Sequence, residues 1–206
     1  MRGAMRRAFV FLLFLLSTLP LHAAEIEAGV QHVIAMTGDT GTLDIKTSRG
    51  FSAHVEVFWS DRVSTRASAT FLNPAAILFP ENPPPTDVDL GTLGLDIYSA
   101  TARIHTKPRR RFSAFAGGGA ALVAIGNLDD QFGDAVEIEF DPEMTFVAEA
   151  GLRYRLYPEI VLEVGVTYLP LEAEANILRP NDPRYPLPST IAVDPLIVSV
   201  GAAWRF

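Results

Sequence analysis

The feature that most constrains the fold is an alternation of apolar and polar residues with a period of two, repeated from residue 25 to the end of the chain. Residues 51–59 (FSAHVEVFW) are typical, because every odd position is apolar and Ser52, His54 and Glu56 lie between them. Successive side chains of a β-strand point to opposite faces, so each such segment has one apolar face. The pattern predicts an all-β protein.

Eight segments carry this alternation, and the connections between them differ regularly in length. The segments are residues 25–36, 50–60, 63–72, 95–105, 112–125, 146–156, 160–169 and 196–206. Residues 60–62, 106–110 and 157–159 read as tight turns, whereas 37–48, 73–94, 126–143 and 172–192 are long and rich in Gly, Pro, Asp and Asn. Short turns at one end and long loops at the other are typical of outer-membrane barrels.

The N-terminus has the form of a secretory signal peptide. Arg2, Arg6 and Arg7 precede an apolar stretch at 8–21, and small residues follow at Ala23 and Ala24. We expect residues 1–24 to be removed and 25–206 to form the mature domain; an uncleaved anchor is the alternative. No other apolar run reaches 18 residues, which excludes a polytopic helical membrane protein.

Aromatic residues predict which face meets lipid. Phe51 and Trp59 lie eight residues apart on one apolar face, and Phe146 and Tyr154 repeat this spacing. Eight tilted residues span on the order of 20 Å, close to the height of the apolar band of such barrels. The predicted periplasmic rim comprises Trp59, Phe112, Tyr154, Trp204 and Phe206, and the predicted outer rim Phe51, Phe71, Tyr98, Phe146 and Tyr168.

We therefore predict an eight-stranded antiparallel transmembrane β-barrel in the outer membrane of a Gram-negative envelope, with apolar faces outward. A soluble barrel of the lipocalin kind would reverse the faces and would need many more exterior Lys and Glu residues. The net charge of −7, without a basic stripe, argues against nucleic-acid partners. The absence of cysteine excludes disulfides and thiolate chemistry.

The inward face predicts a charged floor in the periplasmic half of the lumen. Its expected members are Glu27, Glu56, Arg66, Arg103, Arg153, Arg155, Glu163 and Arg205. Both signs are present, so pairing is expected, and Glu149 or the terminal carboxylate would offset the excess of arginine. Nearer the long loops the inward positions become apolar: Val33, Leu72, Ala121, Val123, Val147, Leu169 and Ile197. Side chains can fill an eight-stranded barrel, which predicts no continuous water channel.

Three stretches resemble the OmpW family of eight-stranded outer-membrane proteins. They are residues 193–201 (VDPLIVSVG) with the ending Trp204-Arg205-Phe206, the Gly-rich segment 112–122, and residues 151–173. The family usually has Tyr at the position of Trp204 and a second Gly near Ala203. The resemblance implies a role in passing small hydrophobic molecules. The closing aromatic–Arg–Phe is shared by many outer-membrane barrels as an assembly signal, so we expect the barrel-assembly machinery to recognise Trp204 and Phe206.

Deleting Phe206 should therefore reduce insertion of the folded barrel while the signal peptide is still processed. The loss would appear as missing heat-modifiable mobility on a gel. Unchanged insertion would reduce Phe206 to an interfacial anchor.

The search for catalytic or metal-binding residues favours neither an enzyme nor a cofactor. His32, His54 and His105 are the only histidines after residue 24, and none belongs to a motif that pairs a nucleophile with its base. We expect His54 to be a hydrogen-bonded lumen residue, and the sequence shows no partner for His32 or His105. The acidic stretch 126–143 lacks EF-hand spacing and reads as a solvated loop; loose binding of divalent cations beside lipopolysaccharide is the alternative.

Two functions remain open. In the first, a small hydrophobic molecule enters the apolar upper lumen and leaves sideways into the membrane, through gaps favoured by Gly117, Gly118, Gly119 and Pro170. In the second, the barrel is structural or adhesive, its lumen is packed, its loops meet partners, and the glycines serve barrel curvature.

Overall fold

The computed structural model describes residues 25–36, 43–78, 88–92, 94–106, 111–126, 137–178, 187–192 and 194–206. The expected signal peptide lies outside these ranges. Within them, no helix is long and apolar enough to cross a membrane.

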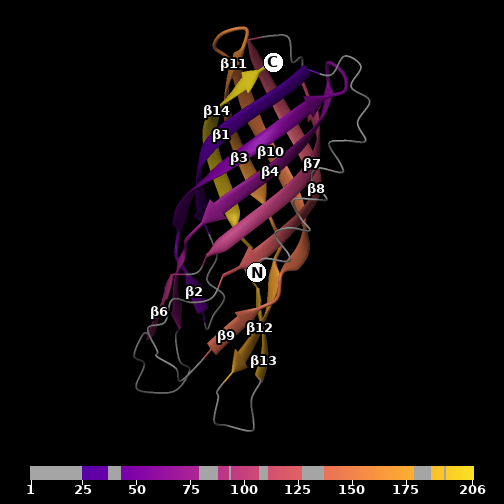
Figure 1. Ribbon diagram of the computed structural model, residues 1–206. Helices are drawn as coiled ribbons and strands as arrows, with labels where there is room; N and C mark the ends of the chain where they lie inside the picture. The colour runs from indigo at the N-terminus through magenta and orange to yellow at the C-terminus, as the bar shows by residue number, and fades with distance from the viewer. Residues whose placement is uncertain are drawn as a thin grey trace.

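Eight strands form a closed antiparallel barrel (Figure 1). They are β1 (Glu25–Met36), β3 (Ser48–Phe58), β4 (Val63–Leu72), β7 (Leu95–His105), β8 (Phe112–Ile125), β10 (Glu143–Arg155), β11 (Ile160–Tyr168) and β14 (Leu196–Arg205). Neighbours in sequence pair with one another, and β1 pairs with β14 to close the barrel. The predicted fold and its eight strands are confirmed, because a period-two pattern with one buried face fixes both strand and orientation.

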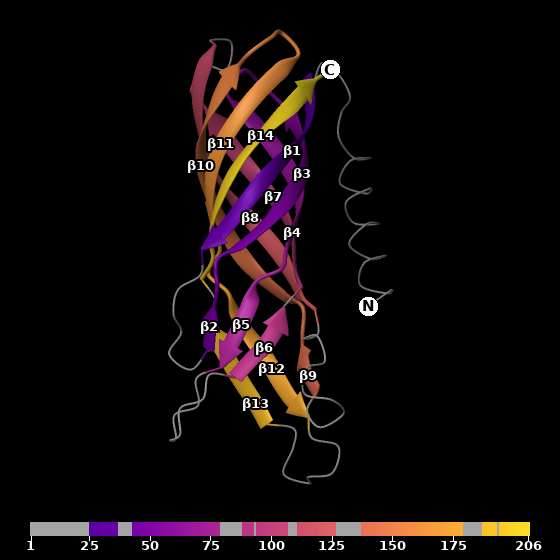
Figure 2. The same ribbon diagram turned by 90° about the vertical axis from the view of Figure 1, so that its left-hand side faces the viewer.

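The long connections contain six short strands that the sequence did not predict. β2 (Leu43–Ile45), β5 (Ala75–Leu78) and β6 (Val88–Thr92) form one three-stranded sheet, and β9 (Glu137–Phe140), β12 (Glu172–Leu178) and β13 (Leu187–Ala192) form another. Both sheets extend the barrel at the end opposite the C-terminus (Figure 2). Strands of three to seven residues offer too few alternations to stand out in a sequence. We call this end the loop end and the other the turn end.

The outer wall is apolar between two bands of aromatic rings. Val30, Ile104, Leu152, Val164 and Val200 are exposed on it. Trp59, Phe112, Tyr154, Trp204 and Phe206 are exposed at the turn end, and Phe51, Phe146 and Tyr168 towards the loop end. Phe51, Phe71 and Tyr98 form an aromatic row on three adjacent strands, with ring centroids 5.0 and 6.3 Å apart. This is the surface of a barrel whose wall meets hydrocarbon, as predicted.

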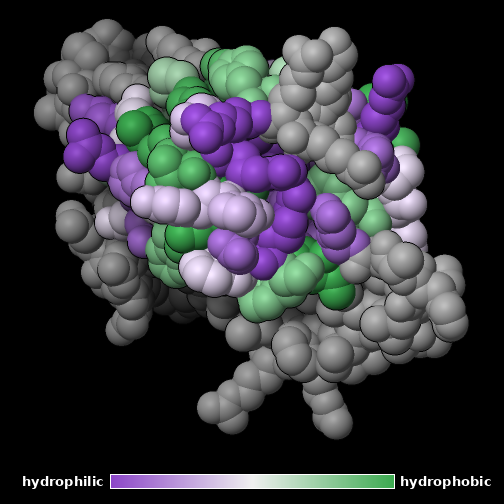
Figure 3. Space-filling model, turned by 90° about the horizontal axis from the view of Figure 1, so that it is seen from above, coloured by the Kyte–Doolittle hydropathy of each residue, from purple (hydrophilic) through white to green (hydrophobic). Residues whose placement is uncertain are grey.

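Polar side chains collect inside the barrel. Seen from the turn end, hydrophilic residues gather across the middle of the face and hydrophobic ones lie around them (Figure 3). The buried charged residues lie in the turn-end half of the lumen, and one apolar cluster fills the loop-end half. The site is built at the border of these two layers.

Candidate functional site in the barrel lumen

Glu163 is the centre of the charged floor. Its carboxylate accepts from Arg66 Nη1, lies 3.4 Å from Arg103 Nη1 and 3.3 Å from Arg153 Nε, and accepts from Gln31 Nε2 at 2.8 Å. All five side chains are buried. One carboxylate on β11 thereby joins guanidinium groups from β4, β7 and β10.

Two further carboxylates extend this network towards the turn end. Glu27 accepts from Arg205 Nη2 at 2.6 Å and also from Arg153 Nη2. Glu56 lies 3.3 Å from Arg103 Nη1. Glu27 and Glu56 are fully buried, so each depends on these cations to offset its lost hydration.

Glu149 supplies a fourth lumen carboxylate. Arg103 donates to it in a two-pronged contact, Nε to Oε1 at 2.7 Å and Nη2 to Oε2 at 2.6 Å, and Thr101 donates to Oε1. The expected excess of arginine is thus partly offset by Glu149. The other two arginines of the floor, Arg155 and Arg205, are half-buried at the turn end. Besides its contact with Glu27, Arg205 lies 3.2 Å from the exposed Glu25.

His105, for which the sequence shows no partner, has two in the structure. Its Nε2 lies 2.7 Å from Ser64 Oγ and 3.1 Å from Glu56 Oε1. Serine and carboxylate meet the same ring nitrogen, whereas a nucleophile–base relay uses both nitrogens of the ring. This buried trio therefore has the geometry of a structural hydrogen-bond cluster.

His54 differs from expectation. Its ring is 5% exposed, and neither ring nitrogen has a hydrogen-bond partner among the described residues. The ring lies over Gly29, where an added Cβ would come within 2.7 Å of His54 Cε1. His32 points the other way and is exposed on the outer wall.

Two inward aromatic rings complete the floor, and the sequence analysis did not name them. The Arg103 guanidinium lies 4.0 Å from the Phe115 centroid, and that of Arg153 lies 5.2 Å from the Phe58 centroid. Phe115 rests against Gly151, where a Cβ would be 2.5 Å from its Cζ. The alternation along β8 could have placed Phe115, because it lies two residues after buried Ser113 and so points to the same face.

The inward apolar residues form one cluster towards the loop end. All seven that the sequence singled out are in it: Val33, Leu72, Ala121, Val123, Val147, Leu169 and Ile197. Ala35, Leu95, Ile97 and Leu171 also belong, and Ile125 and Phe140 pack against it. These eleven buried side chains fill the lumen at this level, so the predicted upper chamber is packed with the protein's own residues.

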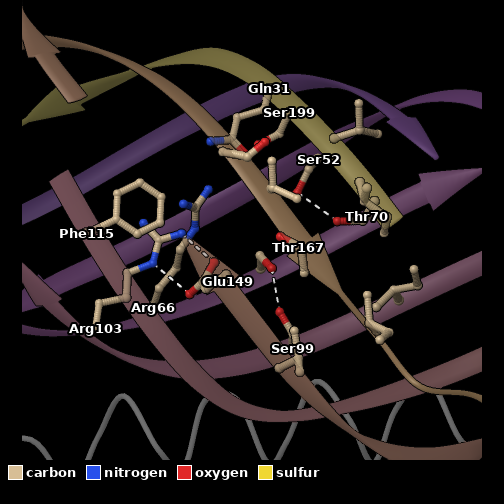
Figure 4. A pocket seen from close by; sticks show the side chains of 18 residues that line it. Gln31, Ser52, Arg66, Thr70, Ser99, Arg103, Phe115, Glu149, Thr167 and Ser199 are labelled. Atoms are coloured by element: carbon tan, nitrogen blue, oxygen red, sulfur yellow. Dashed lines mark hydrogen bonds and ion pairs between the residues drawn. The ribbon is translucent and has the colours of Figure 1, made fainter. Parts of the chain in front are cut away.

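The cavity lies between the floor and this apolar cluster (Figure 4). Its volume is about 40 Å³, enough for roughly three waters and far below the roughly 300 Å³ or more of a typical ligand pocket. Arg66, Arg103 and Glu149 line one side, and Val33, Ile97 and Leu169 the other. The open space is thus at the border of the predicted chamber, because hydroxyl side chains there are too short to meet across the lumen.

The glycine run on β8 leaves no gap in the wall. β8 pairs without interruption with β7 and with β10 around Gly117, Gly118 and Gly119. An added Cβ at Gly117 would lie 2.6 Å from Ala102 O, and at Gly119 1.9 Å from Ala100 O. The expected gap at these glycines is wrong: they allow the neighbouring backbone to approach.

The border between β10 and β11 is different, and we call its loop end the β10–β11 seam. Pairing stops at Ala148 and Tyr168, while β10 continues to Glu143 and pairs there only with β8. Residues 169–171 are not in a strand, and Pro170 has no N–H to donate. Thr145 Oγ1 donates to Pro170 O. Five residues of β10 therefore lack a ladder with β11.

Apolar side chains lie on both sides of the β10–β11 seam. Met144 and Phe146 are 77% and 57% exposed on the outer wall, whereas Val147, Leu169 and Leu171 are buried in the apolar cluster. The seam thus joins the lumen's apolar layer to the lipid-facing wall.

Other predicted features are placed as follows. Trp204 and Phe206 are exposed at the turn end, where Phe206 N donates to Ile26 O at 2.9 Å. Most of the acidic stretch 126–143, including Asp129, Asp130 and Asp134, lies outside the described residues. Within the described part of the chain, no group of His, Asp and Glu side chains has a metal-binding arrangement.

Solved structures share this architecture at low sequence identity. OprG from Pseudomonas aeruginosa is 14% identical, with a TM-score of 0.71, covering 89% of this chain and 95% of that one. The outer-membrane protein AlkL, determined in lipid bilayers, is 16% identical, with a TM-score of 0.63, covering 92% and 93%. Neisserial surface protein A is 13% identical, with a TM-score of 0.53, covering 89% and 97%.

No protein-family model and no curated protein sequence matches the chain. The predicted resemblance to the OmpW family is confirmed as a likeness of fold, and the solved structures carry it. From its closed eight-stranded ladder, its apolar outer wall and these neighbours, we conclude that the chain has the fold of the eight-stranded outer-membrane β-barrels represented by OprG and AlkL.

Proposed function

We propose that the protein admits small hydrophobic molecules at its loop end and releases them sideways into the membrane through the β10–β11 seam. The observation that carries this proposal is the missing ladder beside the apolar cluster. The charged floor blocks straight passage, since a hydrophobic molecule would have to displace paired charges.

The energetics of opening favour the seam over every paired border of the barrel. An unsatisfied backbone group costs several kcal/mol in hydrocarbon, so separating two paired strands inside the membrane is prohibitive. At the seam β10 and β11 share no ladder beyond Ala148 and Tyr168, and the same two chain segments pair again from Phe140 and Ala175, where β9 meets β12. Thr145 bridges the interval by donating to Pro170 O. Moving Leu169 and Leu171 would then join the lumen to the lipid.

A structural or adhesion barrel is the second candidate function. The observation that favours it is the packing of the loop-end lumen, which holds no chamber of ligand size. Such a barrel would have no need of a seam that opens, so locking the seam separates the two functions.

The test is a disulfide across the seam, in a chain that has no cysteine of its own. Val147 and Leu169 occupy the next positions beyond the last paired residues, and both line the cavity. Intact Gram-negative cells expressing Val147→Cys/Leu169→Cys should accumulate radiolabelled octane at least about tenfold more slowly than wild type when oxidised. A reductant should restore the rate.

The matched control is Ile97→Cys/Val123→Cys, which also replaces two residues of the apolar cluster but bridges β7 and β8 where they are already paired. This variant should transport octane equally well oxidised or reduced. Wild-type accumulation no faster than that of cells lacking the protein would contradict transport and favour the structural barrel.

A further inference from the structure

The cavity between the floor and the apolar cluster is rich in unused hydrogen-bond donors. Thr70 donates to Ser52 at 2.9 Å, which leaves the Ser52 hydroxyl proton free, and Ser68 and Ser99 share one hydrogen bond of 2.7 Å between two hydroxyl protons. The Thr167 hydroxyl has no partner among the described residues. All five side chains line the cavity, and Figure 4 shows Ser52, Thr70, Ser99 and Thr167 around it.

The charged residues of the cavity add a cationic donor. Arg66 uses Nη1 for Glu163, and its Nε and Nη2 make no hydrogen bond to the described residues. Glu149 is the carboxylate of the lining, and both of its oxygens already accept from Arg103. The two guanidinium groups of the lining are also paired with Glu163 and Glu56 just outside it, so what the cavity offers is the unused N–H groups of Arg66 rather than an excess of charge.

The opposite side of the cavity is apolar and leads to the β10–β11 seam. Val147 and Leu169 line the cavity and also border the seam. A ligand held by the polar side would therefore extend its remaining atoms past these two residues, towards the apolar cluster and the lipid.

We propose that this cavity binds the head group of an aliphatic monocarboxylate, with the carboxylate on Arg66 and Thr167 and the chain directed to the seam. About 40 Å³ accommodates a carboxylate in place of roughly three waters, but not an alkyl chain. The unused guanidinium donors of Arg66 favour an anionic acceptor, because charge-assisted hydrogen bonds are about twice as strong as neutral ones. This inference rests on the proposed function and names its substrate class.

The test uses decanoate labelled with ¹³C at the carboxyl carbon and the folded mature barrel in lipid nanodiscs. We expect a saturable carboxyl resonance, one ligand per barrel, that nanodiscs without protein lack. Arg66→Lys keeps the charge beside Glu163 but loses the planar fork, and it should weaken binding about tenfold or more. Thr167→Val is nearly isosteric and should weaken binding severalfold.

Ser113→Ala is the control, because Ser113 is buried in the lumen but does not line the cavity. It should bind decanoate as wild type does, and all three variants should retain heat-modifiable mobility. Decanol that displaces decanoate at equal concentration would overturn the choice of a carboxylate.

The absence of a bound resonance would overturn the inference. If octane still accumulates in cells through the unlocked seam, the proposed function survives that failure. If octane uptake fails while decanoate binds, the proposed function fails and the cavity remains a carboxylate site. The two results are thus read independently.

Discussion

Replacing Glu163 by alanine is expected to lower the free energy of unfolding by about 3–5 kcal/mol, the usual cost of removing one partner from a buried ion pair. Here the change leaves Arg66 without its carboxylate partner and takes a shared carboxylate from Arg103 and Arg153, which keep Glu149, Glu56 and Glu27, in a lumen sealed by paired strands. Water would be drawn in to hydrate the guanidinium groups. The same variant should therefore raise ion conductance in planar bilayers above a small wild-type value.

Two control variants distinguish the effect of removing a floor charge from a general loss of barrel stability. Leu169→Ala removes a fully buried residue of the apolar cluster and should cost about 2–5 kcal/mol without raising conductance. Glu25→Ala removes an exposed partner of Arg205 and should cost less than about 1 kcal/mol. A large and steady wild-type conductance would instead mean an open aqueous pore and would contradict lateral exit.

The strands and the facing of their side chains could be predicted because parity carries information along a whole strand. Once Arg103 is placed inward, Leu95 and Ile97 must be inward too, although the sequence analysis did not draw that consequence. A slip of one residue would turn Arg103 into lipid and the apolar outer face into the lumen, so the pattern favours a single orientation. The same logic placed Phe51 and Trp59 on the outer wall.

Side-chain partners could not be predicted, since they depend on the register between strands. Strand β4 pairs Arg66 with Glu56 of β3 and Ser64 with Arg103 of β7. This register across three strands brings His105 of β7 next to Glu56 of β3. Gln31 and Glu163 are 132 residues apart in the chain. No local pattern encodes such distances, which the stagger of the closed barrel decides.

The packing of the loop-end lumen could not be predicted from the sequence either. Whether an apolar layer encloses a chamber depends on the volumes that meet across the barrel. Leu171, which follows the last residue of β11 by three positions, lies outside any alternating strand and yet is buried in the cluster. Pro170 beside it was expected to favour a gap in the wall, and in the structure five residues of β10 have no ladder with β11 there.

A second large loss of stability is expected from substitution of the glycines of β8, and Gly119 is the critical position. In Gly119→Ala the new Cβ would lie 1.9 Å from Ala100 O and 2.8 Å from Thr101 Cα, both on β7. Backbone atoms in a paired ladder cannot rotate away as a side chain can, so β7 and β8 would have to separate inside the membrane. We expect a loss of at least about 3 kcal/mol, at or above the usual range for overpacking, or no folded barrel.

Gly118→Ala is the matched control one residue away. Its Cβ would point outward, with the Phe146 ring and Val147 O each 3.4 Å away at ordinary contact distance. The substitution should change the free energy of unfolding by less than about 1 kcal/mol. Urea unfolding in lipid and heat-modifiable mobility measure both variants. Equal stability of the two would mean that β7 and β8 do not approach closely at Gly119, and that a gap in the wall is the reason for glycine there. The two adjacent glycines differ because successive residues of a strand point to opposite faces. A Cβ at Gly119 would point to the lumen side and meet the backbone of β7, whereas a Cβ at Gly118 would point to the lipid.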